Sequence, residues 1–302
     1  MILRLDAVSR WYGNVVAVNG VSMAIGPGVT GLLGPNGAGK STIIHMMGGF
    51  LPSSAGTATL DGTPIWKNPE VYRHIGLVPE RESAFDFLTG WQFVLSMAKL
   101  HKLPQPGAAA QRALALVEME GAKDRQIGTY SKGMKQRVKM ASALVHDPPV
   151  LLLDEPFNGM DPRQRLHMMD LLRGMAAEGR TILFSSHILE EVERLAGRVL
   201  VIVAGRLAAS GDFREIRRLM TDRPHTFTLR SSNDRALASA LLAEPTTAGA
   251  ALDGGLLTVR ATDFGAFSRA LSGIARRHAI SLHELLPTDE SLESVFSYLV
   301  RR

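Results

Sequence analysis

Residues that could bind phosphate stand together near the N-terminus. Between an apolar segment at 29–33 and a helix-like run lies the loop Gly34-Pro35-Asn36-Gly37-Ala38-Gly39-Lys40-Ser41-Thr42. This is the pattern G-x-x-x-x-G-K-[ST] in the strand–loop–helix setting that a phosphate-binding loop requires. Its three glycines allow positive φ and a close approach to an anion, and N–H groups at a helix start favour negative charge. We expect a nucleotide to contact Gly34, Asn36, Gly37, Ala38, Gly39, Lys40, Ser41 and Thr42.

Within this loop, two side chains have separate chemical tasks. Lys40 supplies a mobile positive charge for the β and γ phosphates, and the Ser41 hydroxyl is a ligand for Mg²⁺. A phosphate loop by itself leaves GTPase, kinase and motor functions open, so other residues must distinguish them.

Two carboxylates follow a second apolar segment. Val150 to Leu153 are apolar, and Asp154 and Glu155 come next. Ligands of open α/β sheets collect at the carboxyl ends of the strands, so a buried strand would place Asp154 beside the phosphate loop, where it holds Mg²⁺ together with Ser41. Glu155 is suited to act as general base on the attacking water. The alternative is that the two acids merely end a strand.

Alternating strands and helices must position these groups. The pattern predicts a largely parallel sheet that helices cover on both faces. The strands are expected at 2–5, 15–18, 21–25, 29–33, 57–60, 75–78, 150–153, 181–185 and 199–203, with a hairpin turn at Asp61-Gly62. Helices are expected at 41–50, 162–178 and 188–196. A helical subdomain at about 85–146 interrupts the pattern, with helices at 89–103, 108–119 and 131–146 and a break at 104–107.

The C-terminal part has a different order of predicted strands and helices. A closing helix at 214–222 and the pair Arg223-Pro224 predict a first domain at 1–222 and a second at 223–302. The second domain is expected to contain strands at 225–230, 250–253, 256–260 and 280–285, and helices at 233–244, 264–278 and 290–300. This β-α-β-β-α-β order suits a small α+β, ferredoxin-like domain.

Composition narrows the functional classes. The chain has 302 residues, a net charge of +5 and no cysteine, which fits a reducing compartment. No apolar run approaches the roughly 18 residues that a membrane span needs, and the N-terminus lacks the apolar core of a signal peptide. The positive charge is spread thinly, so we do not expect nucleic acid as a partner.

Residues 1–215 resemble the ATP-binding cassette (ABC) transporter ATPases. Besides the loop and the acidic strand, the resemblance includes a signature segment, here Tyr130-Ser131-Lys132-Gly133-Met134. Ser131 would cap a helix whose free N–H groups form a second anion site, with Gly133 behind it. In the family this site completes the ATP bound to the opposite subunit. Lys132 and Met134 depart from the usual Gly and Gln of the family, and a plain capped helix is the alternative.

Further residues match the family in the expected order. The resemblance implies that Tyr12 stacks on adenine, a contact worth roughly 1–3 kcal/mol. Glu80 stands where the family has a Gln that links Mg²⁺ and water to the membrane partner, and a carboxylate also binds Mg²⁺. Asp161 belongs to the loop that crosses the dimer interface and contacts nucleotide. His187 matches the histidine that contacts the γ-phosphate, so the expected catalytic residues are Lys40, Glu155 and His187.

The resemblance implies a subunit that hydrolyses ATP with Mg²⁺ and powers a separate transmembrane permease. A second ATPase subunit, identical or different, would close head to tail with this one around two ATP molecules. The permease would dock near residues 80–100, which places the chain peripherally at the cytoplasmic face of the cell membrane. The ending Ser291 to Phe296 resembles that of bacterial exporter ATPases whose small C-terminal domain serves dimer contact or regulation.

Two other functions compete with this reading. A soluble ABC ATPase of the chromosome type would need a long coiled coil, and one of the ribosome type would need two cassettes. The sequence has one phosphate loop and no sustained heptads. A nucleotide-gated regulatory module with impaired turnover would fit the altered signature, whereas Glu155 and His187 argue for turnover.

Overall fold

The structure is a computed structural model that describes residues 1–80, 85–212, 225–253 and 256–287. The chain divides into two compact units, residues 1–212 and 213–302, and each is described by itself. The helices expected at 214–222 and 290–300, and the ending at 291–296, lie outside the described residues.

A six-stranded sheet forms the centre of the first unit, in the order β10-β9-β3-β8-β7-β6. Five of its strands are parallel, as predicted: β3 (Gly28–Leu33), β6 (Ile75–Val78), β7 (Val150–Leu153), β8 (Thr181–Ser186) and β9 (Arg198–Val203). The sixth strand, β10 (Arg206–Gly211), pairs antiparallel with β9 at the edge. It was not predicted, because its small and polar residues carry no strong strand pattern.

A second, antiparallel sheet has the order β2-β1-β4-β5. Its strands are β1 (Leu3–Tyr12), β2 (Val15–Ile25), β4 (Ala55–Leu60) and β5 (Thr63–Pro64). The prediction of two strands within 15–25 was wrong, because one strand continues through Gly20 at φ 60°. The hairpin turn at Asp61 and Gly62 is confirmed, and both residues have the positive φ that such a turn requires.

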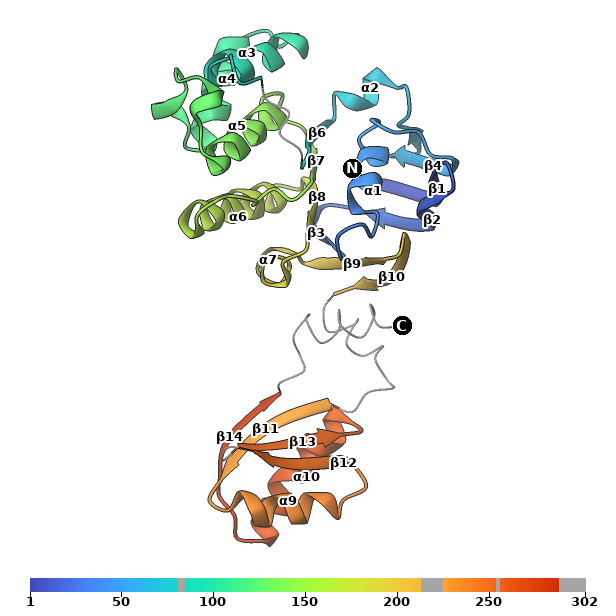
Figure 1. The fold of residues 1–302 in the computed structure, drawn as a ribbon, viewed down its shortest axis with the longest axis vertical. Helices are drawn as coiled ribbons and strands as arrows, with labels where there is room; N and C mark the ends of the chain where they lie inside the picture. Colours follow the sequence, from blue (N-terminus) through green and yellow to red (C-terminus); the bar gives the residue numbers. More distant parts are fainter. Residues whose placement is uncertain (81–84, 213–224, 254–255, 288–302) are drawn as a thin grey trace. The chain divides into compact units, whose positions relative to one another are not determined.

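Helices and the second sheet enclose the central sheet from its two sides. Figure 1 shows α1 (Lys40–Met47) and the antiparallel sheet on one side, and α6 (Pro162–Ala177) and α7 (Leu189–Leu195) on the other. Buried side chains from both sheets and from α1 form one core, including Leu32, Ile43 and Leu183. Each such burial contributes about 1.5–3 kcal/mol. The loop between β3 and α1 is therefore anchored at both ends.

Between β6 and β7 the chain forms the predicted helical layer. It contains α3 (Gly90–Leu100), α4 (Pro106–Leu116) and α5 (Lys132–Leu144). The expected break at 104–107 is shorter than predicted, because Pro106 starts α4 at a position where no N–H is needed. The structure also has short helices that were not predicted: α2 (Pro69–Tyr72), η1 (Glu120–Ala122) and η2 (Ile127–Thr129).

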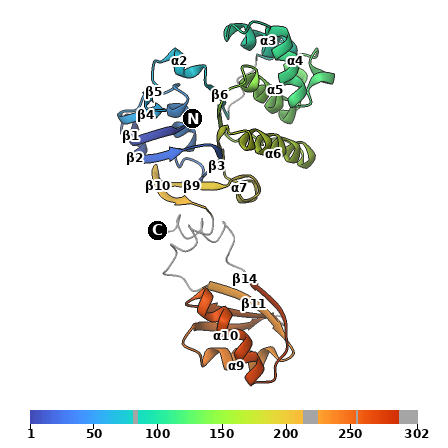
Figure 2. The same ribbon diagram turned by 180° about the vertical axis from the view of Figure 1, so that it is seen from behind.

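The second unit is a four-stranded antiparallel sheet with two helices on one face (Figure 2). Its elements are β11 (His225–Ser231), α9 (Asp234–Leu242), β12 (Thr247–Asp253), β13 (Leu256–Ala261), α10 (Phe264–Arg277) and β14 (Leu282–Pro287). The strand order is β12-β13-β11-β14. Its own core includes Phe227, Leu237 and Phe267.

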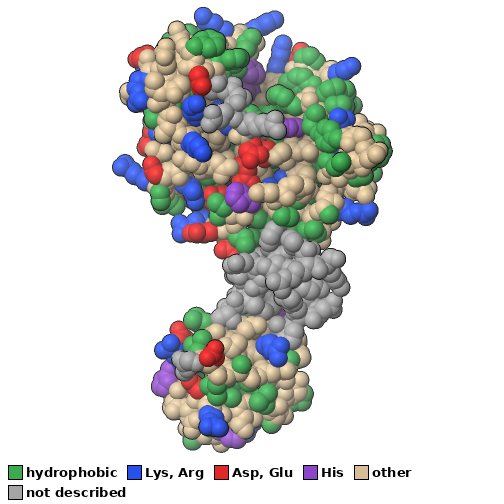
Figure 3. Space-filling view, in the orientation of Figure 1, with side chains coloured by type: hydrophobic (Ala, Val, Ile, Leu, Met, Phe, Trp, Pro, Cys, Tyr) green, Lys and Arg blue, Asp and Glu red, His purple; other side chains and the backbone are tan. Residues whose placement is uncertain are grey.

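The surface carries charges of both signs. On the described part of the face in Figure 3, Lys and Arg side chains stand apart from one another and form no continuous basic surface. None of the helices in the described ranges combines the length and the apolar character that crossing a bilayer requires.

Candidate functional site

The loop between β3 and α1 has the backbone that phosphate binding needs. Gly37 has φ 79° and Gly39 φ 104°, a region that L side chains rarely adopt. Gly34 does not have a positive φ, so that part of the prediction was wrong. Its requirement is space, because a Cβ atom there would lie 2.4 Å from the Ile202 carbonyl oxygen.

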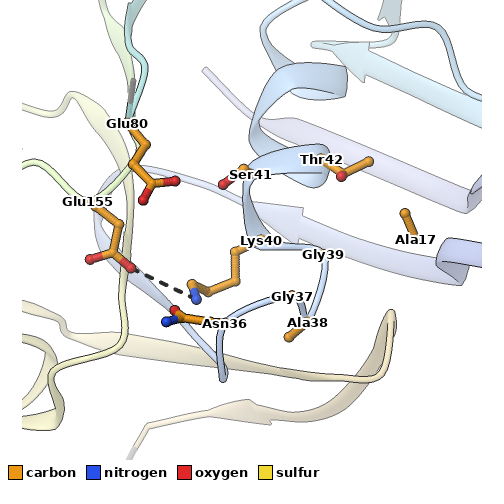
Figure 4. A pocket seen from close by; sticks show the side chains of 10 residues that line it. All are labelled: Ala17, Asn36, Gly37, Ala38, Gly39, Lys40, Ser41, Thr42, Glu80 and Glu155. Atoms are coloured by element: carbon orange, nitrogen blue, oxygen red, sulfur yellow. Dashed lines mark ion pairs between the residues drawn. The ribbon is translucent and has the colours of Figure 1, made fainter. Parts of the chain in front are cut away.

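A cavity of about 280 Å³ opens over this loop. Figure 4 shows Glu80 and Glu155 on one side of it and Ser41 and Thr42 on the other. The cavity is lined by Ala17, Asn36, Gly37, Ala38, Gly39, Lys40, Ser41, Thr42, Glu80 and Glu155. Ala17 of β2 was missed, since a small residue in an apolar strand carries no chemical signal in the sequence.

Lys40 is buried at the base of the cavity. Its Nζ donates hydrogen bonds to the carbonyl oxygens of Gly34 at 2.8 Å and Pro35 at 3.3 Å. The same Nζ lies 3.9 Å from Oε1 of Glu155, and both side chains are over nine-tenths buried. Contrary to the expected mobile charge, the ammonium group is held by the loop and paired with a carboxylate.

Asp154 follows β7 and is fully buried. Its Oδ1 accepts a hydrogen bond from Ser185 Oγ at 2.6 Å, whereas its buried Oδ2 has no hydrogen-bond partner among the described residues. A buried polar atom without a partner is costly unless an ion or water satisfies it. Carboxylate and hydroxyl oxygens are ligands that Mg²⁺ accepts, so the chemistry of Asp154 and of Ser41, which lines the cavity, fits the predicted ion.

Glu155 has a strained backbone and a protonation state that its surroundings control. Its φ is 48°, a value that persists in a non-glycine residue only when the surrounding structure enforces it. Oε2 lies 3.0 Å from His187 Nδ1. Burial raises the pKa of the Glu155 carboxyl, and the hydrogen bond to His187 and the charge of Lys40 oppose that rise. A carboxylate with a raised pKa in a cavity is well suited to accept a proton from water.

Two residues that were not predicted hold the Glu155 backbone. Its N–H donates to Ser185 Oγ at 2.9 Å, and its carbonyl oxygen accepts from Gln136 Nε2 of α5 at 3.3 Å. Both side chains are buried. The only signal for Ser185 was a polar residue at the end of an apolar strand, and Gln136 depends on tertiary packing of α5.

The signature segment forms a capped helix start, as predicted. Ser131 Oγ accepts a hydrogen bond from the Met134 N–H at 3.3 Å. Gly133 is needed for packing, because a Cβ atom there would lie 2.9 Å from the Gly159 carbonyl oxygen. Asp161 caps α6 by accepting from the Gln164 N–H at 2.9 Å. Ser131, Gly133 and Asp161 do not line the cavity above Lys40.

Tyr12 is not among the residues that line the cavity. It ends β1, is 44% exposed, and its ring lies 4.8 Å from the Arg10 guanidinium carbon. Its stacking on adenine stays a prediction.

The structure brings together the phosphate loop, Glu80, Glu155 and His187 within one chain.

Comparisons with known proteins agree with this geometry. Residues 18–158 match the family described as ABC transporter. The daunorubicin/doxorubicin resistance ATP-binding protein DrrA of Streptomyces peucetius is 34% identical over 301 residues, which cover 97% of this chain and 91% of that protein. The chain belongs to the ABC transporter ATP-binding proteins.

Other members of the family match about two thirds to three quarters of the chain. The Nod factor export ATP-binding protein I of Burkholderia orbicola is 40% identical over 216 residues, 68% of each chain. The solved ATP-binding subunit of an ABC transporter superposes with a TM-score of 0.66 at 29% identity, covering 72% of this ABC protein and 93% of that chain. The chain spans 65% of the length of an uncharacterized ABC transporter ATP-binding protein of Synechocystis sp., to which it is 37% identical.

Proposed function

We propose that this chain is the ATP-binding and ATP-hydrolysing subunit of an ABC exporter. The observation that carries the proposal is the buried Glu155 carboxylate, which contacts both Lys40 and His187 at the edge of the phosphate-loop cavity. A plain nucleotide-binding module would need the loop, but it would have no use for a strained, buried carboxylate with a raised pKa. The alternative of an impaired regulatory module therefore has no support in this site.

The residues of the site have separate roles in the proposed hydrolysis of ATP. Backbone N–H groups of the loop and the Lys40 ammonium bind the β and γ phosphates. Mg²⁺, when bound, would be held by Ser41 and Asp154, with Glu80 in the same cavity, and would neutralise phosphate charge. Glu155 orients the attacking water and accepts its proton. His187 fixes the Glu155 carboxylate and stands beside the γ-phosphate.

A second copy of the chain would complete the ATP site. The start of α5 at Ser131 presents N–H groups at the positive end of a helix, and it does not line the cavity above Lys40. Gly133 and the loop before Asp161 pack together, so the two segments would meet the other copy as one surface. Homodimerisation is the simplest arrangement that supplies both halves of each site.

The transmembrane partner would dock on a groove of the first unit. A cavity of about 420 Å³ lies between the end of α1 and helices α3 and α5. Its lining is mostly apolar, and the neighbouring Phe50 side chain is 65% exposed. Such a groove fits an amphipathic helix of a permease. It would hold the chain at the cytoplasmic membrane face. The relatives named for drug resistance and for Nod factor export favour the outward direction.

The second unit has its own core and is proposed as a regulatory or dimerisation domain. Its sheet and helices bury apolar residues such as Phe227 and Phe267 in a cluster of its own. A chain that ends at residue 212 should therefore retain the ATP-binding fold. Circular dichroism and nucleotide titration of that truncated chain test the boundary, and an unfolded product would contradict it.

Copurification from membranes tests the proposed function. The tagged full chain, extracted in mild detergent, should arrive with a multi-span membrane protein, and the pair should hydrolyse ATP. Phe50→Asp should release the membrane protein. ATP should still bind, because Phe50 does not line the cavity above Lys40. Leu242→Asp, in the second unit, places the same charge at another exposed apolar side chain and should retain the partner. A wild-type chain that binds ATP and never turns it over would refute the proposal.

A further inference from the structure

Strand β8 ends with two buried hydroxyls on opposite faces of the sheet. Ser185 and Ser186 are both fully buried, and successive side chains of a strand point in opposite directions. Ser185 faces the two acidic residues of the site. Ser186 Oγ donates to Oε2 of Glu191 at 2.6 Å and accepts from the Ile188 N–H at 2.9 Å. Because Ile188 follows His187 directly, Ser186 fixes the backbone on the far side of this histidine.

Glu191 is a buried carboxylate that the proposed reaction does not use. It is 4% exposed and lies in the first turn of α7. Its second oxygen, Oε1, is 3.3 Å from Nη1 of Arg165 in α6. A carboxylate is withdrawn from water at a large cost unless its oxygens find partners, and here each oxygen has one from a different element. Glu191 therefore joins α6, α7 and the end of β8.

Arg165 connects Glu191 and Ser186 to the loop before α6. It lies one turn into the helix, and its N–H donates to the Asp161 carbonyl oxygen at 2.9 Å. The residues just before Asp161 pack against the start of α5, because a Cβ atom at Gly159 would lie 2.6 Å from the Lys132 Cβ. A movement of this loop would shift the start of α6, and Arg165 would move with it.

We propose that Glu191 is a positioning residue that couples the start of α6 to His187. The network Arg165–Glu191–Ser186 sets where His187 stands, and His187 holds the Glu155 carboxylate at 3.0 Å. Closure against a second copy at the loop before α6 would thereby adjust the contact between His187 and Glu155. This inference rests on the proposed function, since it concerns the same reaction.

The test is a double-mutant cycle in the full chain together with its membrane partner. Glu191→Gln keeps the size of the side chain and removes its charge, so Arg165 no longer holds it in place. The kcat for ATP should fall about 10- to 100-fold, as small misplacements do, with the Kd for ATP within about twofold of wild type. Glu190→Gln is the matched control, because this neighbour is exposed and pairs with Arg194 on the surface.

The cycle separates positioning from a structural role. In a His187→Ala background, Glu191→Gln should lower kcat by less than about twofold, because the two changes act through one contact. Equal losses with and without His187, or a wild-type kcat in Glu191→Gln, would overturn the inference. If Glu191→Gln does not fold, Arg165→Gln breaks the same network from the half-exposed side and must show the same coupling.

A second measurement does not depend on turnover. The NMR signal of the His187 ring, assigned by its loss in His187→Ala, should shift in Glu191→Gln and stay unchanged in Glu190→Gln. An unchanged signal in Glu191→Gln refutes the positioning role even if the chain never hydrolyses ATP. A wild-type chain without turnover would contradict the proposed function instead, so the two failures are distinguishable.

Discussion

Two helix starts in the first unit have the same physics and different surroundings. Both present free N–H groups at the positive end of a helix dipole. The start of α1 opens into a cavity that contains the buried Lys40 ammonium and the Glu155 carboxylate. The start of α5 is capped by the exposed Ser131 and lines none of that cavity. The start of α1 thus lies beside a cation and a carboxylate of its own chain, whereas the start of α5 lies outside that cavity.

This difference suggests which parts of the proposed ATP site come from one chain and which come from a second copy. The residues proposed to bind phosphate, hold the ion and accept the proton all belong to one chain. The start of α5 can contribute N–H groups and the positive charge of Lys132 to a ligand, but its first turn contains no acidic residue. Its separate position fits a role toward another copy, and the predictions below test each side of the comparison.

The largest effect is expected from the α1 side. Lys40→Ala removes the cation from a buried, paired site, and affinity for ATP should fall at least about 100-fold, since a desolvated charge pair is worth several kcal/mol. Isothermal titration with Mg–ATP measures the loss. Lys67→Ala, an exposed lysine beside Trp66, should bind ATP like wild type. Unchanged affinity in Lys40→Ala would show that the loop does not hold the phosphates.

Glu155→Gln should separate binding from turnover at the same helix start. The amide keeps the shape and cannot accept a proton, so kcat should fall about 100- to 10,000-fold, while ATP still binds. Light scattering should show an ATP-dependent dimer that persists, because the reaction that reopens it is blocked. Turnover near the wild-type rate would place the general base elsewhere.

The α5 side is tested by complementation. Ser131→Arg fills the second helix start, and it should abolish turnover while leaving ATP binding at the loop intact. A mixture of Ser131→Arg and Lys40→Ala chains should regain activity that neither variant has alone, because a mixed dimer contains one complete site. Phosphate release as a function of mixing ratio measures this. A mixture as inactive as its components would show that the two helix starts do not meet across chains.

The sequence predicted the parts of this site that depend on local backbone geometry. The phosphate loop follows from glycines and a lysine at fixed spacing, and the acids follow from one apolar strand. Ser185 and Gln136 could not be found this way, because each acts on Glu155 from an element that is distant in sequence. Gly34 was chosen for a wrong reason, since its constraint is the Ile202 carbonyl and not its own φ.

The smallest effect is expected at the far end of α5. The His146 ring stacks on His101 of the α3 end, with ring centres 3.7 Å apart. Its Nε2 lies 3.2 Å from the Ile75 carbonyl oxygen, and its buried Nδ1 has no partner among the described residues. Burial, reinforced by His101, lowers the pKa of His146 to about 4. The helical layer therefore contains a ring that resists protonation.

The sign of the pH dependence follows from linkage. Because the folded chain lowers the pKa of His146 from 6.5 to about 4, the unfolded chain binds the proton more tightly. The contribution of the neutral His146 ring to the free energy of unfolding is fully present above pH 6.5. It is lost as the pH falls toward 4, by on the order of 2 kcal/mol. Urea unfolding at several pH values should show this slope, and His146→Phe, which keeps a stacked ring that cannot titrate, should flatten it.

A control in the second unit completes this test. His278→Phe changes an exposed histidine. This variant should therefore lose stability at low pH just as the wild type does. If His146→Phe and wild type lose stability in parallel, the helical layer is not held by the neutral ring, and the end of α5 contributes nothing distinctive. If only the slope of His146→Phe flattens, the neutral ring stabilises the helical layer by joining the end of α5 to α3.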